Sequence, residues 1–229
     1  MLSAIIVAGG SSQRMGFDKL FAIIAGEPVI AHPIRAFERA TSVGEIVVVA
    51  RKDRHDEIRK ISRDMGFKKI LSIVPGGERR QDSVRAGLDR INQDAKYVAV
   101  HDAARPLITP EQIERAFAQC RVHGAAALAQ PVNDTLKRAD ADLLVVGSVD
   151  RRQLYAMQTP QIFERKLLED AYRAVYAENI LVTDEVSAVE RLGCTIALVL
   201  DDEPDFKITY RRDLPVADFI IRERRKDGR

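Results

Sequence analysis

The hydrophobic positions of this chain follow two alternating patterns along most of its length. Largely apolar runs, typical of buried strands in a parallel sheet, lie at 4–7, 46–50, 70–74, 97–101, 125–130 and 196–200. Between them, apolar residues recur every three or four positions, as on one face of a helix, at 29–40, 54–65, 83–91, 110–121, 164–176, 184–192 and 213–224. This alternation predicts an α/β fold with a mostly parallel sheet and helices on both faces.

One segment departs from the alternation. Two short stretches, at 134–138 and 143–149, flank the Ala-Asp-Ala-Asp sequence at 139–142, a pattern typical of a β-hairpin. No internal repeat and no low-complexity linker divides the 229 residues, a length that a single domain commonly reaches. We therefore expect one domain, 1–229, from which an arm at about 133–155 projects.

The first predicted strand leads into a glycine-rich loop that carries two cations. Ala8, Gly9 and Gly10 open the loop, and Arg14 and Lys19 follow within it. Glycine lets backbone N–H groups close around an oxyanion with no Cβ in the way, and the cations add fixed positive charge. The loop is typical of a polyphosphate-binding site; the alternative is a surface turn with two solvated cations.

Two familiar nucleotide-binding motifs are absent from this loop. The spacing G-x-x-x-x-G-K-[ST] does not occur, and Leu20 after Lys19 offers no hydroxyl for magnesium. A dinucleotide-binding fold needs G-x-G-x-x-G and an acidic residue after the second strand, where this chain has Arg51. These departures disfavour both a P-loop ATPase and a hydride-transferring enzyme.

A second loop, at 75–83, combines a Gly-Gly turn with two arginines. A helix start at Asp82 or Ser83 would let backbone donors, a hydroxyl and cations converge on a base or ribose. An ordinary capped turn between strand and helix is the alternative. The loop therefore predicts contacts to the base or ribose of a nucleotide.

A third loop begins where the strand at 97–101 ends. Asp102 follows this buried strand, where a carboxylate is costly unless it is paired or bound to a metal. It can hold magnesium and so neutralise charge during phosphoryl transfer, or it can pair with Arg105. For His101 a structural role is at least as well supported as a functional one. Ligands of open sheets bind beyond the carboxyl ends of the strands, so we expect the three loops to form one site.

Composition argues against several classes of partner, namely nucleic acid, zinc and a membrane. The net charge is only +2, and the single basic block, at 222–229, fits a solvated helix end, which argues against nucleic acid. Cys120 and Cys194 lack metal-ligand spacing, which suits reduced thiols rather than a zinc site. No basic leader and no apolar run of about 20 residues occurs, so we expect a cytoplasmic protein without a membrane partner.

The motifs of this chain resemble those of 2-C-methyl-D-erythritol 4-phosphate cytidylyltransferases, in the same order and over nearly the whole length. The segments that carry the resemblance are the glycine-rich loop at 8–19, Gly-Gly…Arg…Asp-Ser-Val at 76–84, His-Asp-Ala-Ala-Arg-Pro at 101–106, Pro-Val-Asn-Asp-Thr at 131–135, Thr-Pro-Gln at 159–161, Thr-Asp-Glu at 183–185 and Lys-Ile-Thr at 207–209. The third and sixth of these are specific. The glycine-rich loop is shared with many sugar-phosphate and molybdopterin nucleotidyltransferases.

The resemblance implies a Rossmann-like, doubly wound fold and a nucleotidyltransferase of the non-mevalonate isoprenoid pathway. Such an enzyme joins CTP to 2-C-methyl-D-erythritol 4-phosphate with a divalent cation, Mg²⁺, giving 4-diphosphocytidyl-2-C-methyl-D-erythritol and pyrophosphate. A cytidylyltransferase of ribitol 5-phosphate and a non-catalytic CTP sensor are the alternatives. Ser12 and Gln13 also make the first loop similar to that of molybdenum cofactor guanylyltransferases, whereas the later motifs favour CTP.

The resemblance also implies site residues by position. Arg14, Lys19 and Lys207 would be catalytic and stabilise charge at the α-phosphorus of CTP. The nucleotide would be bound by Ala8, Gly9, Gly10, Gly77, Arg80, Ser83, Asp102 and Ala103. The acceptor substrate would be bound by Asp102, Arg105, Thr135, Arg151, Thr159, Thr183, Lys207 and Thr209.

Three further expectations concern metal, assembly and mechanism. Asp102 would bind the magnesium, and Asp205, where the family often has Asn, suggests a second contact to it. Arg151 would reach the site from the arm of a second subunit, which implies a homodimer. No side-chain nucleophile is needed, because one phosphate attacks another, so charge neutralisation and alignment dominate the chemistry.

Overall fold

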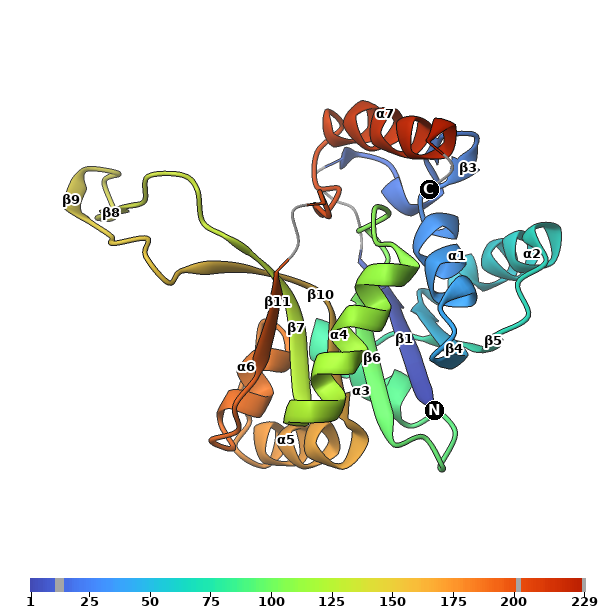
Figure 1. Cartoon of the computed structure of the whole chain (residues 1–229), viewed down its shortest axis with the longest axis horizontal. Coiled ribbons are helices and arrows are strands. Elements are labelled where there is room, and N and C mark those ends of the chain that lie inside the picture. Colours follow the sequence, from blue (N-terminus) through green and yellow to red (C-terminus); the bar gives the residue numbers. More distant parts are fainter. Residues whose placement is uncertain (11–14, 201–202, 228–229) are drawn as a thin grey trace.

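Buried apolar strands form one central sheet in the computed structural model, which describes residues 1–10, 15–200 and 203–227 (Figure 1). Its strands are β1 (Leu2–Ala8), β4 (Val43–Ala50), β5 (Ile70–Pro75), β6 (Tyr97–Asp102), β7 (Ala125–Pro131), β10 (Tyr155–Glu164) and β11 (Ala197–Leu200). Their order across the sheet is β11-β7-β10-β6-β1-β4-β5. Every neighbouring pair is parallel except the two that β10 makes, so the predicted mostly parallel sheet is confirmed.

Helices cover both faces of this sheet, as the periodicity predicts. They are α1 (Ala31–Arg39), α2 (His55–Met65), α3 (Arg80–Leu88), α4 (Pro110–His123), α5 (Arg165–Ala177), α6 (Glu185–Glu190) and α7 (Asp213–Lys226). Two separate cores result, because successive residues of a strand point to opposite faces. Ile6 of β1 packs in the core beneath α1, α2, α4 and α7, whereas Ile5 packs in the core beneath α3, α5 and α6. Among the described residues, no helix has both the length and the apolar character needed to cross a bilayer.

Small elements connect the N-terminal half to the last helix. The 3-10 turns η2 (Lys19–Phe21) and η3 (Lys52–Arg54) follow β1 and β4, and β2 (Ile23–Ile24) pairs with β3 (Glu27–Pro28). Asp218 of α7 accepts a hydrogen bond from the backbone N–H of Ala25, at 2.6 Å. Arg225 of the same helix donates to the backbone carbonyl of Ala25. Helix α7 is thereby fixed to the β2–β3 hairpin close to the glycine-rich loop.

One strand of the sheet was not predicted from the sequence. β10 lies between β6 and β7 and runs antiparallel to both, with Gln161 opposite Val100 and Ala127. Its middle carries Thr159, Pro160 and Gln161, and proline is rare inside a central strand because it donates no ladder hydrogen bond. The pairing with β7 shifts register between Met157 and Gln161, where the proline lies. Tertiary pairing on both sides therefore overrides a local sequence that does not look like a strand.

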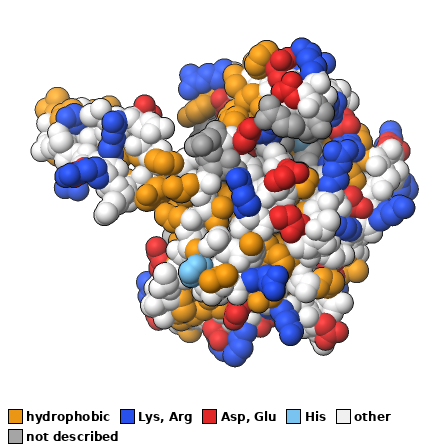
Figure 2. All heavy atoms as spheres, viewed as in Figure 1, with side chains coloured by type: hydrophobic (Ala, Val, Ile, Leu, Met, Phe, Trp, Pro, Cys, Tyr) orange, Lys and Arg blue, Asp and Glu red, His pale blue; other side chains and the backbone are white. Residues whose placement is uncertain are grey.

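The predicted hairpin is present and extends away from the rest of the molecule (Figure 1). Its strands, β8 (Lys137–Ala139) and β9 (Val145–Ser148), form a separate two-stranded sheet. Figure 2 shows hydrophobic side chains on the arm and where it joins the body. Leu144 and Val145 are 65% and 66% exposed. The arm therefore presents apolar surface that the single chain does not cover.

Candidate active site

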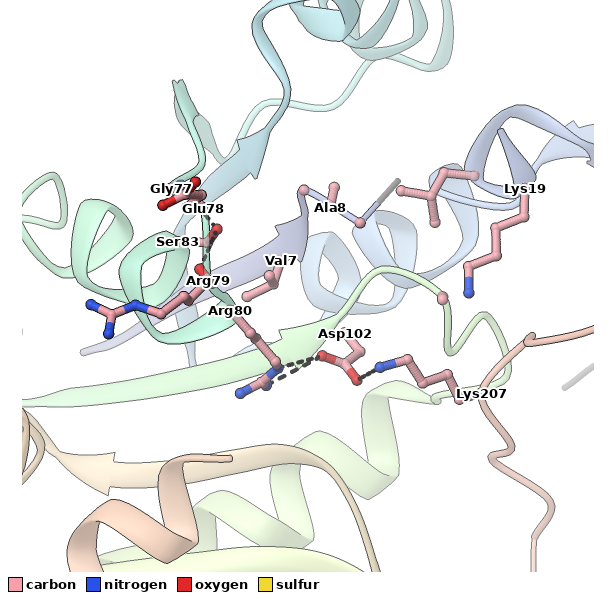
Figure 3. A pocket seen from close by; sticks show the side chains of 14 residues that line it. Val7, Ala8, Lys19, Gly77, Glu78, Arg79, Arg80, Ser83, Asp102 and Lys207 are labelled. Carbon is pink, nitrogen blue, oxygen red and sulfur yellow. Dashed lines mark hydrogen bonds and ion pairs between the residues drawn. The ribbon is translucent and has the colours of Figure 1, made fainter. Parts of the chain in front are cut away.

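A cavity of about 360 Å³ lies at the carboxyl ends of β1 and β6, where the strand order reverses (Figure 3). It brings together three loops that are far apart in the sequence. The residues singled out from the sequence that line it are Ala8, Gly9, Gly10, Lys19, Gly77, Arg80, Ser83, Asp102 and Lys207. Arg14 lies outside the described residues.

The loop at 75–83 forms one wall of the cavity through close backbone packing. A Cβ on Gly77 would lie 2.3 Å from the Cβ of Asp82, so no larger residue fits there. The backbone N–H of Gly77 donates to the hydroxyl of Ser83, at 3.1 Å. Helix α3 begins at Arg80, earlier than the predicted start at Asp82 or Ser83. Asp82, in the first turn of this helix, accepts a hydrogen bond from the backbone N–H of Arg79. The hydroxyl of Ser83 is thereby held at the cavity wall.

Asp102, at the end of β6, lies between two cations. One oxygen, Oδ1, accepts from Nε and Nη2 of Arg80, both at 3.2 Å, and the other, Oδ2, accepts from Nζ of Lys207 at 2.7 Å (Figure 3). Burial opposes ionisation, but the charges of Arg80 and Lys207 outweigh it and hold the pKa of Asp102 well below its usual range. The alternative pairing with Arg105 is not what the structure shows: Asp102 stays ionised because of Arg80 and Lys207.

The far side of the Arg80 guanidinium reaches a second carboxylate. Nη1 and Nη2 of Arg80 donate to the two oxygens of Glu185, at 2.7 and 2.9 Å. The hydroxyl of Tyr172 also donates to Glu185, at 2.9 Å, and both Glu185 and Tyr172 are fully buried. Burial lowers the pKa of Arg80, but the negative charges of Glu185 and Asp102 raise it by more than burial lowers it. The pKa therefore lies above its usual value, and the guanidinium is charged. Arg80 therefore spans two carboxylates.

The segment that precedes α7 and the turn η2 each bring one lysine to the same cavity. The backbone N–H of Ile208 donates to the carbonyl of Ala104 at 2.8 Å, which fixes this segment against the loop after β6. Nζ of Lys19 donates to the carbonyl of Ile208 at 2.5 Å. Because Lys207 immediately precedes Ile208, the contact places Lys19 and Lys207 on neighbouring sides of the cavity, and both line it. Two positive charges thus face a space where a polyphosphate can bind.

His101 has a structural place below the cavity floor. It is fully buried, and its Nε2 lies 3.1 Å from the carbonyl of Arg105, which can only accept, so Nε2 carries the proton. Its Nδ1 then accepts from the hydroxyl of Thr159 at 2.9 Å, and Thr159 itself accepts from the backbone N–H of Asp102 at 3.1 Å. Burial lowers the pKa of His101 to about 4, which keeps the ring neutral.

Comparison with known proteins identifies the family to which this site belongs. A family model described as 2-C-methyl-D-erythritol 4-phosphate cytidylyltransferase matches residues 2–223. The chain belongs to the 2-C-methyl-D-erythritol 4-phosphate cytidylyltransferase family. This confirms the resemblance and places the chain among nucleotidyltransferases of isoprenoid precursor biosynthesis.

Sequence relatives and solved structures agree with this placement. The cytidylyltransferase of Caldanaerobacter subterraneus subsp. tengcongensis is 40% identical over 97% of this chain and 99% of its own length. That of Pelotomaculum thermopropionicum is 37% identical over 97% and 95%. The crystal structure of 4-diphosphocytidyl-2C-methyl-D-erythritol synthase from Anaerococcus prevotii superposes with a TM-score of 0.85, at 28% identity, covering 96% of this chain and 98% of that one. The Rossmann-like fold is therefore that of the cytidylyltransferase family.

Some residues implied by the cytidylyltransferase motifs lie away from the cavity lining. Ala103 is buried, Thr159 lies behind Asp102, and Arg105 donates to the carbonyls of Asp205 and Met157 at 2.5 and 3.3 Å. Thr183 is exposed on the loop before α6. The hydroxyl of Thr209 donates to the backbone carbonyl of Lys207, at 3.1 Å. Within one chain none of these side chains lines the cavity.

The two arm residues are also separate from the cavity. Thr135 and Arg151 are exposed, and Arg151 donates to the carbonyl of Asn133 within the arm. Asp205 is buried 3.9 Å from Arg105 and does not line the cavity. The arm residues Thr135 and Arg151 therefore do not reach the cavity of their own chain.

Sequence reasoning gave no role to Glu185, although the Thr-Asp-Glu motif contains it. The signal was an acidic residue directly before Val186, in a stretch whose apolar positions predict burial. Such a buried carboxylate requires a cationic partner. Nothing local to the motif reveals that this partner is Arg80, 105 residues earlier in the chain.

Of the described residues that line the cavity, Asp102 is the one buried carboxylate that could hold a metal ion, since Glu78 is exposed. No group of three or more His, Cys, Asp or Glu side chains suited to a metal occurs in the described part of the chain. Magnesium in nucleotide enzymes is commonly held by one or two carboxylates together with substrate phosphates and waters. Asp102 fits that mode as a single ligand, provided that Lys207 moves from Oδ2 to a substrate phosphate.

Proposed function

We propose that this chain transfers the cytidylyl group of CTP to 2-C-methyl-D-erythritol 4-phosphate, giving 4-diphosphocytidyl-2-C-methyl-D-erythritol and pyrophosphate. The observation that carries the proposal is the cavity in which Lys19, Asp102 and Lys207 converge from three distant motifs. Membership of the family supports both the nucleotide and the acceptor. The pairing of Lys207 with Asp102 keeps a cation ready at the position where an anionic acceptor would enter.

The proposed reaction is an in-line displacement at the α-phosphorus of CTP. A phosphate oxygen of the acceptor attacks that phosphorus, the bond to the β-phosphate oxygen breaks, and pyrophosphate leaves. Lys19 and Lys207, with Arg14, stabilise the negative charge that grows on the phosphate oxygens in the transition state. Alignment of two bound phosphates supplies the remaining advantage, because neither must find the other in solution.

The nucleotide would lie between the first two loops. Ala8, Gly9 and Gly10 offer backbone at the end of β1, and Gly77 and Ser83 offer a backbone and hydroxyl surface opposite. Arg80 and Asp102 line the same wall, with Ala103 behind. The small side chains leave room for a flat base, and the absence of a Cβ at Gly77 lets this loop pack against Asp82 and so shapes the wall.

Magnesium would accompany the triphosphate in this proposal. Asp102 is the carboxylate that would hold it, and the ion would supply further charge neutralisation of the phosphates. Asp205 is less suited to a direct contact, because its side chain is buried beside Arg105 and outside the cavity lining.

The acceptor side would be completed by a second subunit in a homodimer. Thr135 and Arg151 lie on an arm whose apolar side chains, Leu144 and Val145 among them, are exposed in the single chain. Covering these side chains with a second copy would stabilise the assembly and bring Arg151 to the partner's site. Arg105, Thr159, Thr183 and Thr209 would frame the acceptor from within the same chain.

The two cysteines support a reducing compartment for this enzyme. Cys120 and Cys194 are both free thiols, and burial raises the pKa of Cys120 to about 12. A thiol held protonated in this way is a small apolar side chain, not a redox group. We therefore place the enzyme in the cytoplasm.

Pyrophosphate release tests the proposed function directly. Purified protein is incubated with CTP, Mg²⁺ and either 2-C-methyl-D-erythritol 4-phosphate or ribitol 5-phosphate. We expect release with the first acceptor and not with the second. Release with ribitol 5-phosphate alone would reassign the acceptor, and CTP binding without release from either would indicate a sensor. Replacing CTP by GTP serves as the control for base choice.

A further inference from the structure

Glu185 is a fully buried carboxylate that does not line the cavity. Its two oxygens accept hydrogen bonds from Nη1 and Nη2 of Arg80 and from the hydroxyl of Tyr172, at 2.7, 2.9 and 2.9 Å. Its backbone N–H donates to the side chain of Gln161 at 3.1 Å. A buried carboxylate with this many donors is well satisfied, and removing its charge leaves its cationic partner without compensation.

Arg80 has two edges, and Glu185 occupies one of them completely. The other edge, Nε with Nη2, lies on Oδ1 of Asp102. Oδ2 of Asp102 is therefore left for Lys207, and Figure 3 shows Arg80, Asp102 and Lys207 in a row. The planar guanidinium makes this arrangement specific, since its donors point in fixed directions.

The charges of the four groups cancel in this arrangement. Glu185 and Asp102 carry two negative charges, and Arg80 and Lys207 carry two positive ones. Without the charge of Glu185, Arg80 would be free to take both oxygens of Asp102 in a bidentate pair, or to turn towards an anion in the cavity. A bidentate pair would displace Lys207 from Oδ2, and a turn towards the anion would leave Oδ1 open to Lys207, so neither arrangement holds Lys207 on Oδ2 alone.

We propose that Glu185, braced by Tyr172, is a positioning residue that holds Arg80 on Oδ1 of Asp102 and so keeps Lys207 placed for the acceptor phosphate. The last step rests on the proposed function. The sequence motif assigns Arg80 to the nucleotide, but its donors are directed to two carboxylates. Glu185 therefore acts on the acceptor half of the reaction, through Arg80, and not on CTP binding.

The effects on the two substrates separate this role from a merely structural one. In Glu185→Gln we expect kcat/KM for 2-C-methyl-D-erythritol 4-phosphate to fall about tenfold to a hundredfold, because small misplacements of a catalytic group have effects of this size. The Kd of CTP, measured by calorimetry without acceptor and with EDTA in place of Mg²⁺, should change by less than about threefold, because Glu185 does not line the cavity. Glu190→Gln, an exposed glutamate on the same helix α6, is the matched control and should behave as the wild type.

A double-mutant cycle tests whether Glu185 acts through Arg80. Arg80→Gln alone should lose acceptor kcat/KM, and adding Glu185→Gln to it should cost less than about a further threefold, because coupled residues are not additive. Independent, multiplying losses would overturn the proposal. A Kd of CTP that rises as much as the acceptor kcat/KM falls would also overturn it, since Arg80 would then serve the nucleotide.

Tyr172→Phe keeps the test decisive if Glu185→Gln does not fold. It removes one hydrogen bond to Glu185 and keeps the ring, so we expect a melting temperature close to that of the wild type and a twofold to tenfold loss in acceptor kcat/KM. Wild-type kinetics in a folded Tyr172→Phe protein would overturn the bracing role. A wild-type protein that releases no pyrophosphate from CTP and acceptor would instead refute the proposed function, which keeps the two failures distinct.

Discussion

The body of the molecule and its arm solve the problem of apolar surface in opposite ways. In the body, Ile5 and Ile6 of β1 are fully buried in two cores on the two faces of the sheet. In the arm, Leu144 and Val145 are about two-thirds exposed. Burial of apolar area contributes roughly 25 cal/mol per Å², so the body is stabilised by its own chain and the arm is not.

The same difference divides the candidate site. The cavity that contains Lys19, Asp102 and Lys207 is assembled within one chain, in which Asp102 and Lys207 already form an ion pair. Arg151 lies on the arm, exposed, with its side chain on the carbonyl of Asn133. The cavity is therefore built by folding alone, whereas the proposed contribution of Arg151 would require a second copy of the chain.

Truncating one side chain in each region gives the largest contrast in stability. Phe163→Ala on β10 should lower the free energy of unfolding by about 3–5 kcal/mol, because it empties a fully buried site in the core. Leu144→Ala on the arm should change it by less than about 0.5 kcal/mol at dilute protein concentration. Urea titrations measure both. An equal loss in the two variants would mean that the arm packs within its own chain.

Removing a cation from the cavity should affect turnover far more than stability. Lys19→Ala should lower kcat about a hundredfold to a thousandfold, because it removes a group that stabilises developing charge. The melting temperature should change little, since Lys19 is half-buried and lies at the cavity, outside the two hydrophobic cores. Lys60→Ala, an exposed lysine on α2, serves as control. Near-normal turnover in Lys19→Ala would contradict the catalytic role proposed for Lys19 in the cavity.

Acid should destabilise the body through His101. The folded protein keeps this ring neutral down to about pH 4, whereas in the unfolded chain it gains a proton near pH 6.5. Between these values only the unfolded state is protonated, so stability falls as the pH is lowered, by at most about 3 kcal/mol. His101→Gln should flatten this part of the profile in urea titrations from pH 7 to 4. A profile unchanged by the substitution would contradict the assignment.

A charge on the arm should weaken association and leave the body folded. Val145→Glu places a carboxylate on the exposed apolar strand β9, and we expect the dimer Kd to rise at least about tenfold, or about 1.4 kcal/mol. Val122→Glu on α4 makes the same change at a side chain that is 74% exposed and outside the arm, and should have no effect. Sedimentation equilibrium distinguishes them. Equal dissociation constants would move the interface away from the arm.

Local patterns in the sequence predicted most strands and helices, but they did not predict β10 or which strands pair in the sheet. The strands at 4–7 and 46–50 and the helix at 110–121 are present because burial on both faces, or on one face of a helix, leaves a regular apolar period. β10 escaped prediction because its place between β6 and β7 is set by pairing, while Pro160 obscures the strand pattern.

The sequence by itself determined the α/β class, the projecting hairpin and the three loops that meet at the cavity, because each depends on residues close together in the chain. The tertiary structure decided the partners: Asp102 pairs with Arg80 and Lys207 instead of Arg105, and Glu185 anchors Arg80. Lys207 lies 105 residues from Asp102, and Glu185 lies 105 residues from Arg80. Charges so far apart meet only when the sheet order is fixed, and no local period records that order.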